Sequence, residues 1–281
     1  MKPTVQAALK TAIKATLAIL SIAPLAAQAP KANLPESLRL YVLDCGLLHS
    51  RNPAARPDMV VACYLIAHPK GTLMWDAGVI PDEMFTPGVT TPRVGSASAD
   101  KPLREQLRAA GYDPKDITYF ALSHYHFDHV ANSNMFAGST WLVRKAERDK
   151  MVNGTSDSRN NALDHISLLK NSKYRIVESE EYDVFGDGSV VLKSTPGHTP
   201  GHQVLFVNLK KSQPVVLAGD LYHFRDEIGS PTAPASDEDG AQTLKSRQQL
   251  DEFLKQHKAE MWIEHELAVF EKQRKAPQFY E

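Results

Sequence analysis

Residues 117–129 read ITYFALSHYHFDH, an apolar run followed by three histidines and an aspartate. The run 117–122 is typical of a short buried strand. Within the next residues lie four side chains that can bind a divalent cation: His124, His126, Asp128 and His129. On a turning segment, the first two can face one ion while the last two begin the next turn and face a second. The stretch therefore predicts two adjacent metal sites at the end of a strand.

Three later runs end in the same way, each at a residue that can bind a metal ion: residues 190–194 lead to His198 in the turn TPGHTPGH, residues 215–219 to Asp220, and residues 261–264 to His265. Glycine and proline in the first of these segments favour tight turns. In open α/β architectures, ligands collect at strand ends. We therefore expect the four segments to build one shared site, with the Asp220 carboxylate able to bridge two ions.

The rest of the chain predicts a mixture of strands and helices, and hence an α/β fold. Strand-like runs occur at residues 38–43, 60–67, 72–75, 117–122, 139–143, 190–194, 204–207, 215–217 and 261–263. Helical spacing of apolar residues occurs at 103, 107 and 110, at 162, 166 and 169, and at 250, 253 and 254. No linker divides residues 30–281, which we expect to form a single domain. Two irregular stretches, 79–100 and 227–240, have the length of binding loops.

The composition describes an ordinary globular protein, and its balanced charge favours a small or apolar substrate. Of 281 residues, 42% are hydrophobic, and 32 basic residues balance 33 acidic ones. A nucleic-acid partner normally requires a clustered excess of Lys and Arg, which is lacking here. Beyond the first residues no apolar run is long enough for a membrane span. The sequence leaves a homodimer open.

The N-terminus predicts export. Residues 1–29 contain Lys2, Lys10 and Lys14, then an apolar run at 15–25, then small residues, which is the order of a secretory signal peptide. The expectation is a secreted protein in the periplasm of a Gram-negative bacterium. The alternative is an amphipathic or poorly ordered N-terminal extension.

The two cysteines, Cys45 and Cys63, lie in predicted neighbouring strands. In an oxidising compartment they could form a disulfide bond. Two buried free thiols are the alternative, and the sequence does not choose between them.

Taken in order, H-x-H-x-D-H, TPGHTPGH, Gly-Asp and Glu-His resemble the metallo-β-lactamase superfamily. The resemblance implies an αβ/βα sandwich with a dinuclear metal site at one edge of the sheets. It also implies two divalent metal ions, with zinc as the first expectation. Carried over by residue, it implies these ligands: His124, His126 and His198 for the first ion, Asp128, His129 and His265 for the second, and Asp220 bridging both together with a hydroxide.

Residues 40–46, 123–129 and 195–203 resemble the N-acyl-homoserine lactonase group of that superfamily. This implies a hydrolase that opens a lactone ring (quorum quenching) by attack of the bridging hydroxide, with Asp128 moving a proton. The group has a substrate-contacting tyrosine three residues after the bridging aspartate. Here that position is His223, preceded by Tyr222, so either side chain is a candidate for the contact.

Other functions fit the same residues. An exported β-lactamase, or a general esterase or lactonase, would use the same metal site, whereas a non-catalytic member would only bind metal. Met84 and Phe85 either line an acyl-chain pocket or pack within their loop. Asp76 is expected to be mainly structural, and His202 to support a ligand rather than bind metal.

Overall fold

A computed structural model describes residues 34–54, 56–153 and 165–281. The predicted signal peptide, residues 1–29, lies outside this part of the chain, as does Ala162 of one predicted helical pattern.

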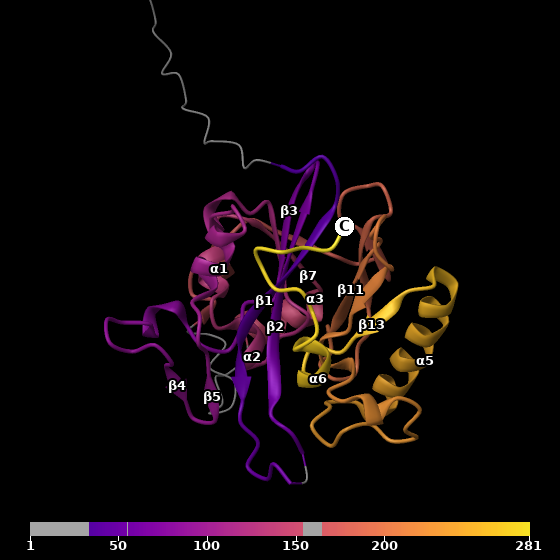
Figure 1. Ribbon diagram of the computed structural model, residues 1–281. Coiled ribbons are helices and arrows are strands. Elements are labelled where there is room, and N and C mark those ends of the chain that lie inside the picture. The colour runs from indigo at the N-terminus through magenta and orange to yellow at the C-terminus, as the bar shows by residue number, and fades with distance from the viewer. Residues whose placement is uncertain (1–33, 55, 154–164) are drawn as a thin grey trace, which may run out of the picture. The chain divides into compact units, whose positions relative to one another are not determined.

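The strands of the described residues form two sheets. The larger has eight strands in the order β4-β5-β1-β2-β3-β6-β7-β8. Its members are β1 Arg39–Leu48, β2 Met59–His68, β3 Gly71–Trp75, β4 Arg93–Val94, β5 Ala97–Ser98, β6 Tyr119–Ala121, β7 Thr140–Val143 and β8 Tyr174–Ile176. β1 and β2 form a long antiparallel hairpin at its centre (Figure 1), whereas β3, β6, β7 and β8 run parallel.

The smaller sheet has five strands in the order β13-β12-β11-β10-β9 among the residues described. These are β9 Glu181–Asp183, β10 Val190–Ser194, β11 Gln203–Val207, β12 Val215–Leu217 and β13 Glu260–Trp262. β12 and β13 pair in parallel, and the other pairs are antiparallel. The parallel pair brings the carboxyl ends of β12 and β13 to the same edge, where Asp220 and His265 follow.

The α-helices of the described residues are α1 Leu103–Ala109, α2 Phe127–Val130, α3 Lys145–Asn153, α5 Gly240–His257 and α6 Leu267–Phe270. α5 begins at a capping aspartate, because the Asp239 side chain accepts a hydrogen bond from the Gln242 amide. It ends at His257, and the next residue, Lys258, adopts the left-handed conformation common after a helix. In the part of the chain that the structure describes, no helix has the length and hydropathy that a membrane span requires.

Apolar side chains fill three layers. Between the two sheets lie side chains from both, including Leu40, Tyr64, Trp75, Leu205 and Trp262. The other face of the eight-stranded sheet packs against α1, and the other face of the five-stranded sheet packs against α5 (Figure 1). Alternate residues of a strand point to opposite faces, so β1 and β2, which are buried on both faces, carry near-continuous apolar runs. The order helix, sheet, sheet, helix confirms the predicted αβ/βα sandwich.

Cys45 and Cys63 form a disulfide bond between β1 and β2. Their Cα atoms lie 5.9 Å apart, and 18 positions separate them in the sequence. The bond lies beside a bulge, where the register of β1 against β2 shifts between Asp44 and Leu47. Of the two alternatives that the sequence left open, the structure has the disulfide.

Candidate dinuclear metal centre

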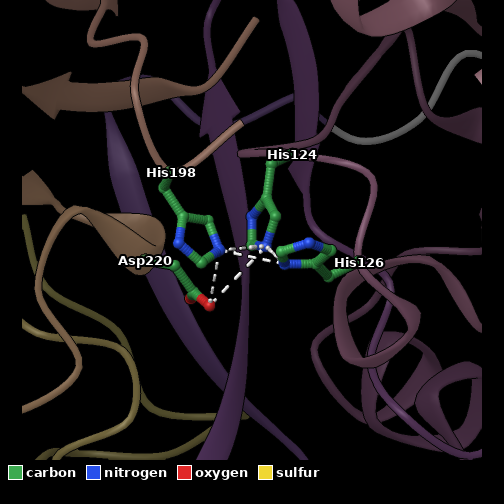
Figure 2. Close-up of side chains that lie close together, drawn as sticks. All are labelled: His124, His126, His198 and Asp220. Atoms are coloured by element: carbon green, nitrogen blue, oxygen red, sulfur yellow. Dashed lines mark hydrogen bonds and ion pairs between the residues drawn. The ribbon is translucent and has the colours of Figure 1, made fainter. Parts of the chain in front are cut away.

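The first cluster of candidate ligands joins three histidines and a carboxylate (Figure 2). Nδ1 of His126 lies 2.9 Å from Nε2 of His124 and 2.9 Å from Nε2 of His198. The Nε2 atoms of His124 and His198 are 3.2 Å apart. Oδ2 of Asp220 lies 3.3 Å from Nε2 of His198 and 3.6 Å from Nε2 of His124. Three ring nitrogens therefore converge with one carboxylate oxygen on a single point.

The second cluster lies on the other side of the same carboxylate. Oδ1 of Asp220 is 3.0 Å from Nε2 of His265 and 3.1 Å from Nε2 of His129. Oδ2 of Asp128 lies 3.6 Å and 3.8 Å from the same two nitrogens. Since each oxygen of Asp220 faces one cluster, this residue is placed to bridge two ions. All seven residues that the sequence singled out as ligands are thus brought together.

Three of the histidines are held by partners on the far side of the ring. In each case Nδ1 meets an oxygen: His129 contacts Asp76 at 2.8 Å, His198 contacts Asp237 at 2.9 Å, and His265 donates to the carbonyl of Val60 at 2.7 Å. Such an oxygen places the ring proton on Nδ1 and leaves the lone pair on Nε2. The free lone pairs therefore point into the two clusters.

This arrangement fits a pair of divalent cations. Nε2 of His129, Nε2 of His265 and Oδ1 of Asp220 are buried and make no hydrogen bond, although each of the two nitrogens lies 3.0–3.1 Å from that oxygen. Electron-rich atoms that face each other without protons repel unless a cation lies between them. Burial also lowers the pKa of His124 well below its usual value, which favours the neutral imidazole that binds metal. Nitrogen and carboxylate donors are suited to zinc and similar ions.

Asp76 organises the loop that carries the first ligands. It follows β3 with a φ of 59°, so its side chain turns under residues 123–129. One oxygen accepts from the Ser123 amide at 2.6 Å, and the other accepts from the Ser123 hydroxyl at 2.8 Å. Together with its contact to His129, this gives Asp76 the structural position that the sequence analysis expected.

His202 holds the backbone of Asp220 in place. The His202 ring is fully buried, and its Nε2 accepts a hydrogen bond from the Asp220 amide at 3.1 Å. Nδ1 lies 2.9 Å from the Thr195 hydroxyl. Gly219 has a φ of +51°, and a Cβ there would meet Nε2 of His202 at 2.8 Å. A glycine is therefore required for the chain to pass this close and present Asp220.

A cavity of about 530 Å³ opens over the two clusters. Its walls include the apolar side chains of Leu48, Met59 and Phe127. Met84 and Phe85 are half-buried and pack against the core beside the eight-stranded sheet. They do not line this cavity, and the packing that the structure shows is against the core and not merely within their loop.

His223 and Tyr222 lie on opposite sides of the chain. The backbone at Tyr222 is extended, so successive side chains point in opposite directions. His223 lines the cavity, whereas the Tyr222 ring is buried in the layer beneath α5, with the Arg247 guanidinium 4.3 Å from the ring centroid. The structure brings His223 to the site and does not bring Tyr222 there.

The His223 ring lies between two carboxylates. Nε2 is 3.3 Å from Oδ2 of Asp220, and Nδ1 is 3.6 Å from Oε1 of Glu227. Glu227 is held in turn by an ion pair with Arg247. Burial alone would lower the pKa of His223, but the two carboxylates raise it to about 10. Both carboxylates therefore favour a proton on the ring nitrogen that faces them.

Sequence reasoning missed the carboxylates that support the ligands, namely Glu147, Glu227 and Asp237. None lies at a fixed spacing from a ligand motif. Glu147 has one available signal, because it opens a helix directly after the run 139–143, but many surface glutamates do so.

Comparisons with known proteins agree with this geometry. A model of the metallo-beta-lactamase superfamily matches residues 56–260. The N-acyl homoserine lactonase AttM of Rhizobium radiobacter is 27% identical over 259 residues, which cover 86% of this chain and 98% of that protein. The N-acyl homoserine lactonase AiiA of Bacillus thuringiensis subsp. kurstaki has the same identity and coverage.

A solved structure of an N-acyl homoserine lactone hydrolase, with N-hexanoyl-L-homoserine bound at its catalytic metal centre, superimposes with a TM-score of 0.68. That chain is 25% identical, and the match covers 86% of this chain and 98% of that one. The superfamily model alone spans more than half of the sequence and includes six of the seven candidate ligands. The chain belongs to the metallo-β-lactamase superfamily.

Proposed function

We propose that this protein is a metal-dependent lactonase that opens the ring of N-acyl homoserine lactones, a quorum-quenching activity. The observation that carries the proposal is the bridging position of Asp220 between two clusters of ligands, beneath a cavity with an apolar wall. The relatives named as N-acyl homoserine lactonases, which match along nearly their whole length, support the same substrate class.

The metal centre would supply the electrophile and the nucleophile. Two adjacent divalent ions, when bound, lower the pKa of a water molecule and polarise a carbonyl. His124, His126 and His198 would hold one ion, Asp128, His129 and His265 the other, and Asp220 both. Zinc is the metal we propose, because the donors are imidazole nitrogens and carboxylate oxygens only.

Two side chains in the cavity wall would bind the substrate and transfer a proton. His223 lines the cavity, with Nε2 close to Asp220, and its ring would donate a hydrogen bond to an oxygen of the lactone. Asp128 also lines the cavity, so its carboxylate is placed to pass a proton to the alkoxide that leaves when the ring opens. The acyl chain would lie along Leu48, Met59 and Phe127.

We further propose that the protein acts after export, in the periplasm of a Gram-negative bacterium. The support is the order of charged, apolar and small residues in 1–29, together with the disulfide bond, since such bonds persist in oxidising compartments. Fractionation of cells that express the full chain, with mass analysis of the mature protein, tests this. Full-length protein in the cytoplasm alone would contradict it.

Proton release tests the activity, because opening a lactone liberates an acid. Metal-loaded protein is mixed with a long-chain N-acyl homoserine lactone, and nitrocefin is assayed beside it. Rapid acid release without nitrocefin turnover is expected. Nitrocefin turnover alone would assign a β-lactamase, and an aryl ester cleaved in preference to the lactone would assign a general esterase.

A further inference from the structure

Glu147 is a buried carboxylate that lies outside both ligand clusters. It is 2% exposed and sits in the first turn of α3. Its oxygens accept hydrogen bonds from two separate loops, and both loops carry metal ligands. It does not line the cavity either, so the proposed chemistry gives it no direct role.

One group of contacts holds the loop after β6. Oε1 of Glu147 accepts a hydrogen bond from the Tyr125 amide at 2.6 Å. Tyr125 lies between His124 and His126 in the sequence, and its amide belongs to the peptide unit that joins it to His124. The bond therefore fixes the backbone from which both rings project.

A second group of contacts holds the loop after β10. The Thr199 hydroxyl donates to Glu147, with its oxygen 2.9 Å from Oε2 and 3.1 Å from Oε1, and the Gly201 amide donates to Oε2 at 2.9 Å. Thr199 directly follows His198. A Cβ at Gly201 would lie 2.6 Å from Cβ of Glu147, so the loop packs directly on the helix.

These contacts come at an energetic cost to the folded chain. Burial raises the pKa of Glu147 to about 7, although the donors from Thr199, Gly201 and Tyr125 all act to lower it. A neutral or apolar residue would be the simpler choice for packing alone, since buried charges are commonly replaced without loss of stability. A carboxylate, in contrast, accepts from several donors at once and can hold two loops together.

We propose that Glu147 is a positioning residue that sets the separation between the His124/His126 loop and the His198 loop, and so determines the affinity of the first metal site. Its hydrogen bonds go to the residues beside His124, His126 and His198. Of the second ion's ligands, Asp128 and His129 lie farther along on α2 and His265 follows β13, so the effect should be larger on the first ion than on the second. The inference rests on the proposed dinuclear metal centre, and it does not depend on which lactone is the substrate.

Metal binding tests this directly. Zn²⁺ affinity is measured at pH 8 by competition with a chromophoric chelator, and Co²⁺ absorption reports the geometry at each ion. Glu147→Gln is expected to weaken one of the two ions at least tenfold, the range found when partners of metal ligands are removed. The other ion should stay within threefold. In a His265→Ala background, which impairs the second site, the remaining affinity should fall by the same factor.

Two variants and a stability measurement separate positioning from support of the fold. Thr199→Val, which removes one donor and keeps the shape, should weaken the same ion by a smaller factor. The controls are Glu178→Gln, an exposed glutamate, and Ser139→Ala, which removes a buried hydrogen bond to Ile117. Both should bind two ions as the parent does. Metal-free Glu147→Gln should unfold at a urea concentration no lower than that of the metal-free parent.

The results would overturn the inference in two ways. Glu147→Gln could bind both ions within threefold of the parent, or it could lose both equally while its metal-free form unfolds earlier. Failure of the parent to bind metal at all would instead overturn the proposed function.

Discussion

The Cys45–Cys63 disulfide should contribute about 3 kcal/mol to the free energy of unfolding. The bond closes a loop of 18 positions, and the chain-entropy relation gives about 3 kcal/mol at 25 °C for a loop of that length. For a domain of this size, the loss should lower the midpoint of thermal unfolding by roughly 6 °C. The hairpin of β1 and β2 keeps its ladder without the bond, so the effect lies mainly in the unfolded chain.

Urea unfolding of metal-free protein measures this value. Four samples are compared: the oxidised parent, the parent reduced with a phosphine, and Cys45→Ala/Cys63→Ala without and with the reductant. The reduced parent and the double variant should both lose about 3 kcal/mol, and the reductant should leave the double variant unchanged. A loss below about 1 kcal/mol in both would refute the loop-entropy reasoning.

Three further predictions concern the site. His223→Ala should lower kcat/KM for a lactone by about tenfold to a hundredfold, as expected for one lost donor, while Tyr222→Phe should leave it within threefold; the reverse order would contradict the placement of the two rings. Asp220→Asn should remove the bridge, so metal analysis should find fewer than two ions per chain and turnover should collapse; full occupancy with normal turnover would contradict it. The folded-state pKa of Glu147, about 7, lies above its ordinary value of 4.5, so its stability contribution is fully present below about pH 4.5 and is lost as the pH rises through 7. In urea titrations, metal-free Glu147→Gln should therefore gain up to about 3 kcal/mol on the parent between pH 4 and pH 8, and a pH-independent difference would exclude the shift.

The metal ligands could be predicted from the sequence because each of them follows closely after a strand-like run. His124, His126, Asp128 and His129 lie within one turn after an apolar strand, and the other three ligands each end a strand-like run. The nine strand-like runs of the sequence correspond to nine of the thirteen strands in the part of the chain that the structure describes. The four that were missed, β4, β5, β8 and β9, have two or three residues each and carry little apolar periodicity.

The remaining features depend on tertiary contacts that spacing cannot reveal. His223 and Tyr222 are neighbours in an extended segment, so their side chains point in opposite directions. The sequence could not show which of the two points into the site. Asp237 meets His198 across 39 positions, and Glu147 meets Thr199 across 52. Met84 and Phe85 are apolar, as the residues that line an acyl-chain pocket are, but they pack against the core instead.

The ligands come from both sheets, and this has a mechanical consequence. His124 and His126 follow β6 of one sheet, whereas Asp220 and His265 follow strands of the other. Bound ions would therefore link the two sheets at one edge. They would also hold together the apolar side chains that lie between the sheets at that edge. Under a pulling force, the metal-loaded protein should yield as one unit. After the ions are removed by a chelator, the two sheets should separate more easily at this edge, because the lone pairs and carboxylates that remain there repel one another.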